Sequence, residues 1–124
     1  MNWGIYLNNV EDLIIYKQYV ELIYYTEQLL KKFPKSERFG LCTQIKNCTY
    51  NGMKNIILAY KKFDKSEKLA ALTNLDVNLK MLKILVRISK RNKYINNNNY
   101  CAWVKKLTNI NNLMLGWFSK CAKV

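Results

Sequence analysis

Residues 65–93, KSEKLAALTNLDVNLKMLKILVRISKRNK, carry the clearest periodic pattern in the chain. Large apolar side chains recur there every three or four residues, at Leu69, Leu72, Leu75, Leu79, Leu82 and Val86. This spacing predicts a helix over about 65–93 with a buried leucine seam. A second apolar row lies beside the seam, at Val77, Met81, Ile84 and Ile88. A helix with two apolar rows either sits centrally in its domain or also contacts another subunit.

Two helices are predicted before this one. Apolar residues repeat at helical spacing from about 10 to 33, and Asn8 or Asn9 can cap the first turn. Pro34 ends this helix because the residue before a proline is pushed out of the α region. Proline also suits the first turn of a helix, so the next helix is expected over about 35–62. Its inward residues, in varying degree, are Phe39, Leu41, Ile45, Cys48, Met53, Ile56, Ile57, Ala59 and Tyr60.

Two local signals refine this description. Gly52 lies inside the second predicted helix, where glycine costs about 1 kcal/mol relative to alanine. Close approach of a neighbouring helix is therefore the expected reason for this glycine. Asp64 and Glu67 have the spacing of a capping box at the start of the helix that follows.

A fourth helix is predicted over about 97–120, after asparagines at 96–99 that suit a loop and a helix cap. Its apolar face includes Trp103 and Trp117, and a buried indole N–H needs a hydrogen-bond acceptor. Short connections between four helices make an up-down-up-down antiparallel four-helix bundle the simplest all-α architecture. The length suits a single domain spanning residues 1–124.

The charge of the chain points to an anionic partner. Lysine and arginine number 21 against 8 aspartates and glutamates, which gives a formal net charge of +13. Nucleic acid is the commonest partner of such a protein. The chain has no histidine, which removes the usual general base and the commonest zinc ligand. We therefore expect a binding protein with no enzymatic activity, no cofactor and no metal.

The cysteines and the apolar runs indicate a compartment. The four cysteines are Cys42, Cys48, Cys101 and Cys121, and none forms a C-x-x-C pair. No signal peptide is recognisable, and charged or amide residues interrupt every run that approaches the length of a membrane span. The expectation is a cytoplasmic protein with reduced, mostly buried thiols.

The candidate binding residues lie on the helix predicted over 65–93. They share a basic side chain and one end of that helix: Lys80, Lys83, Arg87, Lys90, Arg91 and Lys93. The first four fall at i, i+3, i+7 and i+10, on one stripe. No acid follows Asp76, which lies within the leucine seam and is interpreted as a structural carboxylate that needs a partner. We hypothesise a phosphate-tracking surface, while a solvated face near a helix C-terminus remains the plainer interpretation.

Other candidates are weaker. The lysines of the second predicted helix are interpreted as solvated surface: Lys46, Lys54, Lys61 and Lys62. Several tyrosines could stack on unpaired bases, although core or subunit-interface positions are favoured for them: Tyr16, Tyr24, Tyr25, Tyr60 and Tyr94.

The segment FPKSERFGL at 33–41, followed by Gln44-Ile45, resembles the first helix junction of a small four-helix-bundle family. That family is encoded in intervening sequences of bacterial large-subunit ribosomal RNA genes. Its Asn-Ile-Ala-Glu-Gly-like motif is replaced here by NIILAY at 55–60. The rest is similar to a sister branch, the accessory variability determinant (Avd) proteins of diversity-generating retroelements. The residues that carry this similarity are Lys68-Leu69, Leu72, Leu75-Asp76, Leu79, Leu82, Val86-Arg87, Tyr94-Ile95, Tyr100, Trp103 and LGWFSK at 115–120.

This resemblance implies an accessory protein without enzymatic activity that assembles as a ring-like homopentamer. It also implies binding to the reverse transcriptase of the same element and to RNA or DNA. These partners would place the protein in cDNA synthesis during mutagenic retrohoming. Small residues of the family pattern are missing from the segment 110–118, which bears on the details of assembly.

Two alternatives stay open. A structural or interaction bundle of the ribosomal intervening-sequence type would need no nucleic acid. Binding to an anionic membrane surface would need a helix whose apolar and basic faces are both free, whereas the apolar faces here are expected in the bundle core.

Overall fold

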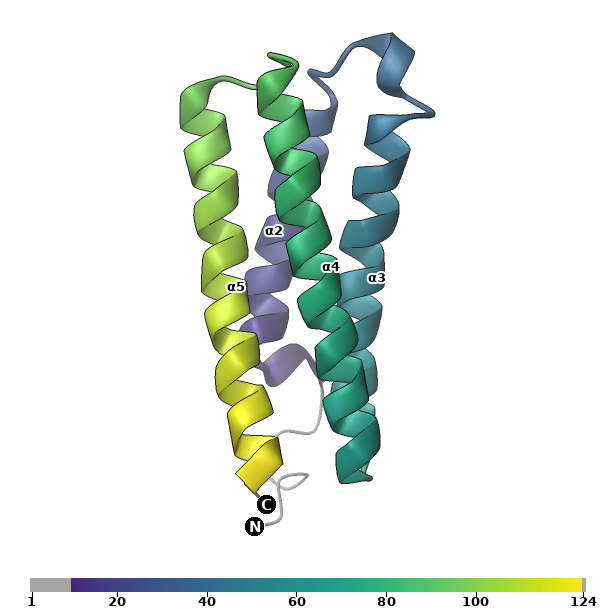
Figure 1. Ribbon diagram of the computed structural model, residues 1–124, viewed down its shortest axis with the longest axis vertical. Helices are drawn as coiled ribbons and strands as arrows, with labels where there is room; N and C mark the ends of the chain where they lie inside the picture. Colours follow the sequence, from purple (N-terminus) through teal and green to yellow (C-terminus); the bar gives the residue numbers. More distant parts are fainter. Residues whose placement is uncertain (1–9, 124) are drawn as a thin grey trace.

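The computed structural model describes residues 10–123. It contains four long helices, α2 (Ile14–Leu30), α3 (Leu41–Lys61), α4 (Lys65–Arg91) and α5 (Asn97–Lys123). Two short 3-10 helices, η1 (Val10–Asp12) and η2 (Lys35–Glu37), precede α2 and α3. The long helices lie side by side and alternate in direction, with α4 packed against both α3 and α5 (Figure 1). The predicted all-helical four-helix bundle is confirmed.

The junction between α2 and α3 is longer than the sequence indicates. The first helix ends at Leu30, and α3 begins at Leu41 rather than just after Pro34. Pro34 has φ −58° and ψ 146°, an extended conformation that leads into η2 instead of opening α3. The Glu37 carboxylate accepts hydrogen bonds from the Leu41 amide (3.3 Å) and from the Tyr94 hydroxyl (2.7 Å). The predicted start of this helix at about residue 35 was wrong, because the junction is folded against the loop before α5.

The helix starts differ in how they are capped. Helix α2 begins at Ile14 after Leu13, whose side chain makes no capping hydrogen bond, and the asparagines at 8–9 lie outside the described residues. At the start of α5, the Asn96 side chain accepts a hydrogen bond from the Asn99 amide at 2.7 Å. The predicted asparagine cap of the fourth helix is therefore confirmed.

The leucine seam of α4 faces the core. Its buried members are Leu72, Leu75, Leu79, Leu82 and Val86, whereas Leu69 is half-buried. On α5, Trp103 is fully buried, and its Nε1 donates a hydrogen bond to Thr26 Oγ1 at 3.1 Å, which is the acceptor that the sequence required. Trp117 is only half-buried. Each fully buried large apolar side chain stabilises the fold by about 1.5–3 kcal/mol, so this seam is a main source of stability.

Gly52 makes room in α3 for a side chain of α2. A Cβ atom at Gly52 would lie 2.0 Å from Tyr19 Oη and 2.7 Å from Tyr19 Cζ. Tyr19 is fully buried, and its hydroxyl donates a hydrogen bond to the Thr49 carbonyl at 2.6 Å. Burial raises the pKa of Tyr19, which keeps the hydroxyl protonated as a donor. The close approach expected at Gly52 is confirmed, and the approaching group is a tyrosine ring.

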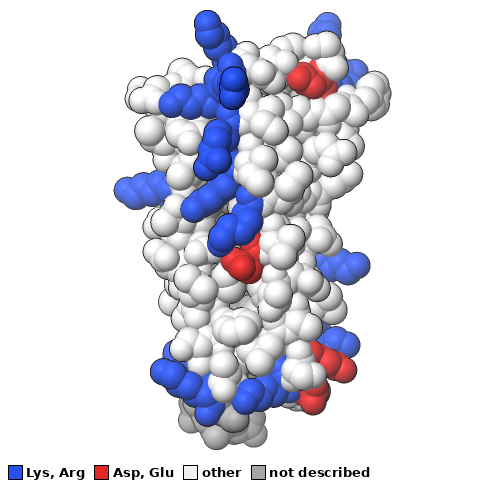
Figure 2. Space-filling view, in the orientation of Figure 1, with Lys and Arg blue, Asp and Glu red and all other residues white. Residues whose placement is uncertain are grey.

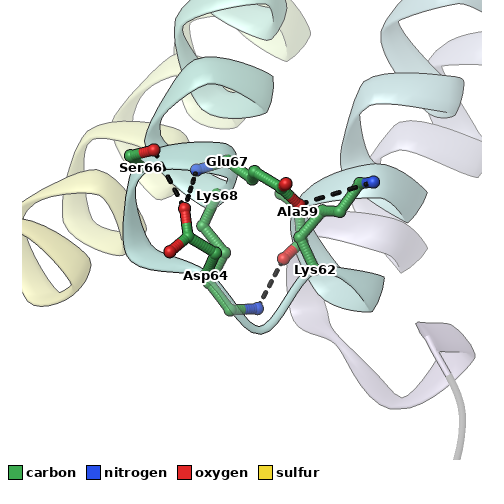
Figure 3. A network of polar contacts seen from close by, with 6 residues as sticks. All are labelled: Ala59, Lys62, Asp64, Ser66, Glu67 and Lys68. Carbon is green, nitrogen blue, oxygen red and sulfur yellow. Dashed lines mark hydrogen bonds and ion pairs between the residues drawn. The ribbon is translucent and has the colours of Figure 1, made fainter.

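The turn between α3 and α4 is closed by a helix cap (Figure 3). The Asp64 carboxylate accepts hydrogen bonds from the Ser66 hydroxyl (2.9 Å) and from the Glu67 amide (3.1 Å). These two bonds, the hydroxyl first, hold the pKa of Asp64 below its usual value. The ionised carboxylate therefore faces the positive end of the α4 dipole, and the Asp64 half of the predicted capping box is confirmed.

Two lysines complete the same turn. Lys62 forms an ion pair with Glu67 at 3.5 Å, and the Lys68 ammonium donates a hydrogen bond to the Ala59 carbonyl at 2.6 Å (Figure 3). The second contact satisfies a carbonyl in the last turn of α3, where helix carbonyls lack backbone partners.

Helix α4 ends in a Schellman motif that contains a lysine at the left-handed position. The Tyr94 amide donates to the Ser89 carbonyl (3.0 Å), and the Lys93 amide donates to the Lys90 carbonyl (2.9 Å). Lys93 has φ 63°, a conformation that usually belongs to glycine.

The four thiols are unpaired, as expected, but only Cys42 is buried. Cys48 and Cys121 are half-buried and Cys101 is exposed, so the expectation of mostly buried thiols was wrong. None of the helices formed by residues 10–123 combines the length and the apolar character that crossing a membrane requires.

Candidate nucleic-acid interface

Four of the predicted cations form a single row on the outside of α4. We call these residues the basic stripe: Lys80, Lys83, Arg87 and Lys90. Lys83 is half-buried, and the other three are exposed. Figure 2 shows a column of positive side chains along α4, with an uncharged strip of surface next to it toward α3. Ten residues of α-helix span about 15 Å, so the stripe can follow an extended anionic chain over that length.

Arg91 and Lys93 continue the positive charge beyond the end of the basic stripe. Both side chains are exposed. A lysine in the left-handed region costs about 1–2 kcal/mol relative to glycine, so the backbone of Lys93 does not explain why a lysine stands there. Cations near a helix C-terminus also interact favourably with the helix dipole, which accounts for part of the charge at this end.

Lys80 is the cation of the stripe that has an acidic partner. Its Nζ lies 2.7 Å from Asp76 Oδ1 and donates a second hydrogen bond to Asn111 Oδ1 on α5 at 3.1 Å. Asp76 is therefore on the outer surface at the end of the stripe, and its predicted place within the leucine seam was wrong. An exposed i, i+4 pair of this kind contributes about 0.3–0.5 kcal/mol, so it can open at little cost.

Lys90 is held by neutral groups at the start of α5. Its Nζ donates a hydrogen bond to Asn97 Oδ1 at 2.9 Å and lies 4.3 Å from the centre of the Tyr100 ring. Neither contact removes the positive charge. Within residues 10–123, Lys83, Arg87, Arg91 and Lys93 form no ion pair. The interface therefore offers five cations without a carboxylate partner and one with a weak partner.

The second apolar row of α4 is exposed. We call these residues the apolar stripe: Val77, Met81, Ile84 and Ile88. Their exposed fractions lie between 40% and 62%. A row of large apolar side chains in water marks a contact surface more often than a solvated face. Of the two arrangements that the sequence left open, the structure thus leaves room for a contact with another subunit.

The surface between the apolar stripe and α3 is uncharged. A shallow cavity of about 390 Å³ lies there, lined by Gln44, Asn47, Cys48, Asn51, Met81 and Leu85. Beneath it, Asn55 Nδ2 donates to Asn78 Oδ1 at 2.7 Å, and both side chains are buried. The basic stripe and this neutral surface thus lie on opposite borders of the same helix.

The weaker candidates are scattered. Lys46, Lys54 and Lys61 are exposed on α3, Lys62 is exposed directly after it, and none of the four joins the basic stripe. Of the five tyrosines considered for base stacking, Tyr24 is 61% exposed, and the others are half-buried against the core. These positions agree with the packing interpretation for four of the five.

Phe39 lies on the surface, which differs from its predicted inward position. Phe39 was assigned to the inward face of a helix, but it precedes α3 and is 90% exposed. Its neighbour Arg38 lines a cavity between α2 and α3 together with Lys46 and other basic residues. Sequence spacing gave no sign of this cluster, because its members come from two helices and the segment between them.

In the part of the chain that the structure describes, no group of three or more cysteine, aspartate or glutamate side chains could hold a metal ion.

The family model described as bAvd-like matches residues 13–121. The matched segment includes α2, α3, α4 and most of α5, and with them every residue of the basic stripe and the apolar stripe. No curated protein matches the chain.

Proposed function

Because this chain belongs to the bAvd-like family, we propose that it is the accessory protein of a diversity-generating retroelement. In this role it binds the reverse transcriptase of the same element, together with RNA or DNA, and supports mutagenic cDNA synthesis and retrohoming. It contributes binding surfaces and catalyses no step itself. The lack of histidine in a chain of net charge +13 supports a binding role over general acid–base catalysis.

The single observation that carries the nucleic-acid part of the proposal is the basic stripe. Among the residues that the structure describes, three of its four cations have no carboxylate partner, and the fourth has an exposed one. Such cations bind phosphates by releasing counterions, without reading the base sequence. The protein is therefore a low-specificity binder in this proposal.

The apolar stripe supports assembly of several copies into a ring, with five subunits implied by the family resemblance. Copies of a chain with charge +13 repel one another, so they approach best through a face without charges. The apolar stripe and the amides of α3 provide that face, and contact there leaves the basic stripe accessible on each subunit.

A co-purification experiment tests the proposal. This protein is expressed together with the reverse transcriptase encoded nearby, and the mass of the complex is measured by light scattering. The expected result is a stable complex that contains several copies of this protein and one polymerase. No complex, or no such gene nearby, would contradict the proposal and favour a purely structural bundle.

A further inference from the structure

A second candidate site lies at the end of the bundle where α2 passes into α3. A cavity of about 500 Å³ lies there, between the last turn of α2, the segment 31–38 and the first turns of α3. We call it the end cavity. Its volume is in the range of small-molecule sites, and its floor includes the apolar side chains of Leu30 and Phe33.

The walls of the end cavity carry an excess of positive charge. Four cations line it, Lys31, Lys35, Arg38 and Lys46, against one carboxylate, Glu27. None of the four forms an ion pair with any residue between 10 and 123. Like charges gathered around one cavity repel one another, so an anion in the cavity would relieve a cost that the fold otherwise carries.

The nearby carboxylates are already engaged by neutral donors. Glu27 accepts a hydrogen bond from the Tyr50 hydroxyl. Glu37 accepts hydrogen bonds from the Tyr94 hydroxyl and the Leu41 amide. Burial raises the pKa of the Cys42 thiol in the cavity wall, so no thiolate balances the cations either. The neutral donors leave the charge of Glu27 in place, so the cavity wall keeps an excess of positive charge, with four cations against one carboxylate.

We propose that the end cavity binds the terminal phosphate monoester of a nucleotide. A monoester carries a charge of about −1.5 to −2 at pH 7, compared with −1 for a phosphodiester, so four cations favour the terminal group. A cavity of about 500 Å³ is in the volume range of sites that hold small molecules such as one nucleotide. The nucleotide can be free or can form the phosphorylated end of a single strand.

Phe39 adds a surface for the base. It follows Arg38, a residue of the cavity wall, in the chain, and its side chain is 90% exposed to water. A base stacked on an aromatic ring contributes about 1–3 kcal/mol of binding free energy in single-strand complexes. The cations thus hold the phosphate, and Phe39 holds the base.

The test compares a fluorescent single-stranded oligonucleotide that carries a 5′-phosphate with the same strand ending in a 5′-hydroxyl. Fluorescence anisotropy is measured for both strands, and adenosine 5′-monophosphate is used as a competitor. We expect the 5′-phosphate to tighten binding about tenfold, in line with the energy of one or two charge-assisted hydrogen bonds. If the monophosphate alone binds, the source is a free nucleotide; if it also displaces the phosphate-dependent part of strand binding, the source is a strand end.

Two variants locate the effect. The double substitution Arg38→Gln and Lys46→Gln should abolish the preference for the 5′-phosphate, because it removes two of the four cations. The matched control removes two exposed lysines elsewhere on α3 that form no ion pair with residues 10–123, Lys54→Gln and Lys61→Gln, and should keep the preference. Phe39→Ala should weaken binding of adenosine 5′-monophosphate. Inorganic phosphate has no base, so its competition with the 5′-phosphorylated strand should be unchanged.

The inference rests on the proposed function only if the bound phosphate belongs to the end of a strand. The experiment distinguishes failure of the cavity as a phosphate site from failure of the proposed function. Equal affinities for the two strands, together with no binding of the monophosphate, would overturn the end cavity as a phosphate site. Loss of the preference in both double variants would overturn it as well, since net charge would then explain the effect. Binding of the monophosphate without any strand binding would keep the cavity site and contradict the nucleic-acid role of the basic stripe.

Discussion

Helix α4 packs against α3 on one border and against α5 on the other, and the polar groups at the two borders differ in charge and burial. Along its middle turns, α4 contacts α3 through neutral groups: Asn55 donates to Asn78, both buried, and the half-buried Cys48 thiol donates to the Asn78 carbonyl at 3.3 Å. Toward α5, the bridging groups are cationic and exposed, as in the contacts of Lys80 with Asn111 and of Lys90 with Asn97. A buried amide cannot change its partner without a large cost, whereas an exposed lysine can exchange an asparagine for a phosphate. The first border contributes to stability and is the face that we propose for assembly, and the second is available to a ligand.

The largest effect is expected when charge is placed on the neutral border of α4. Met81→Lys combined with Ile84→Lys should reduce the assembly to single chains of 14.7 kDa, because an unpaired charge in a contact is strongly unfavourable. Light scattering measures the mass. The control places lysines at two exposed apolar positions away from α4, Ile14 and Leu115, and should keep the mass of the original protein. An unchanged mass in the first variant would exclude the apolar stripe as the subunit contact.

Removing charge from the other border should change nucleic-acid binding and leave assembly intact. With all six cations of the interface replaced by glutamine, the log–log salt dependence of single-strand binding should become less steep by about 4, at about 0.7 per phosphate contact. The replaced residues are Lys80, Lys83, Arg87, Lys90, Arg91 and Lys93. Titrations at several salt concentrations measure the slope. The same slope as in the original protein would remove this surface from consideration.

Substitutions at the two borders should differ by more than about 1 kcal/mol in their effect on the free energy of unfolding. Asn78→Ala leaves the buried amide of Asn55 without its acceptor and should lower the free energy of unfolding by about 2–3 kcal/mol. Asn111→Ala removes an exposed contact of Lys80 and should change it by less than about 0.5 kcal/mol. Urea unfolding gives both values. Similar losses at the two positions would show that the borders do not differ in energy.

Within the basic stripe, the carboxylate partner of Lys80 provides a finer comparison. Arg87→Gln should reduce the salt slope of single-strand binding by about 0.7, the value of one full phosphate contact. Lys80→Gln should reduce it by less, because Asp76 already compensates part of that charge. The two single variants are titrated side by side. A larger effect at Lys80 would contradict this ranking.

The smallest effect is expected at the end of α4. Lys93→Gly should raise the free energy of unfolding by about 0.5–1 kcal/mol, because glycine adopts a φ of 63° without strain. Thermal unfolding measures the gain. Lys93→Asn, which removes the same charge but tolerates this conformation less well than glycine, should gain less. A loss of stability in Lys93→Gly would mean that the lysine side chain stabilises this turn.

The local sequence predicted the features that depend on spacing along one helix. The seam of Leu72 to Val86, the basic stripe and the tight contact at Gly52 all follow from helical periodicity or from a residue that only crowding explains. Phe39 and Asp76 were misplaced because their surroundings depend on neighbouring segments. Pro34 is compatible with either a helix start or an extended turn, and contacts between Glu37 and Tyr94, distant in sequence, accompany the second. The end cavity was missed for the same reason.

Tyr19 and Gly52 are expected to change only together during evolution, because each fits the space that the other leaves. A side chain gained at position 52 collides with the tyrosine hydroxyl at 2.0 Å, which costs about 1–3 kcal/mol in a packed core. Loss of the ring at position 19 leaves a void at a comparable or greater cost. Either single step passes through a less stable protein, so descendants of this sequence are expected to keep both residues or to replace both together. Covariation of these two positions would therefore identify relatives that share this packing even where the rest of the helices has diverged.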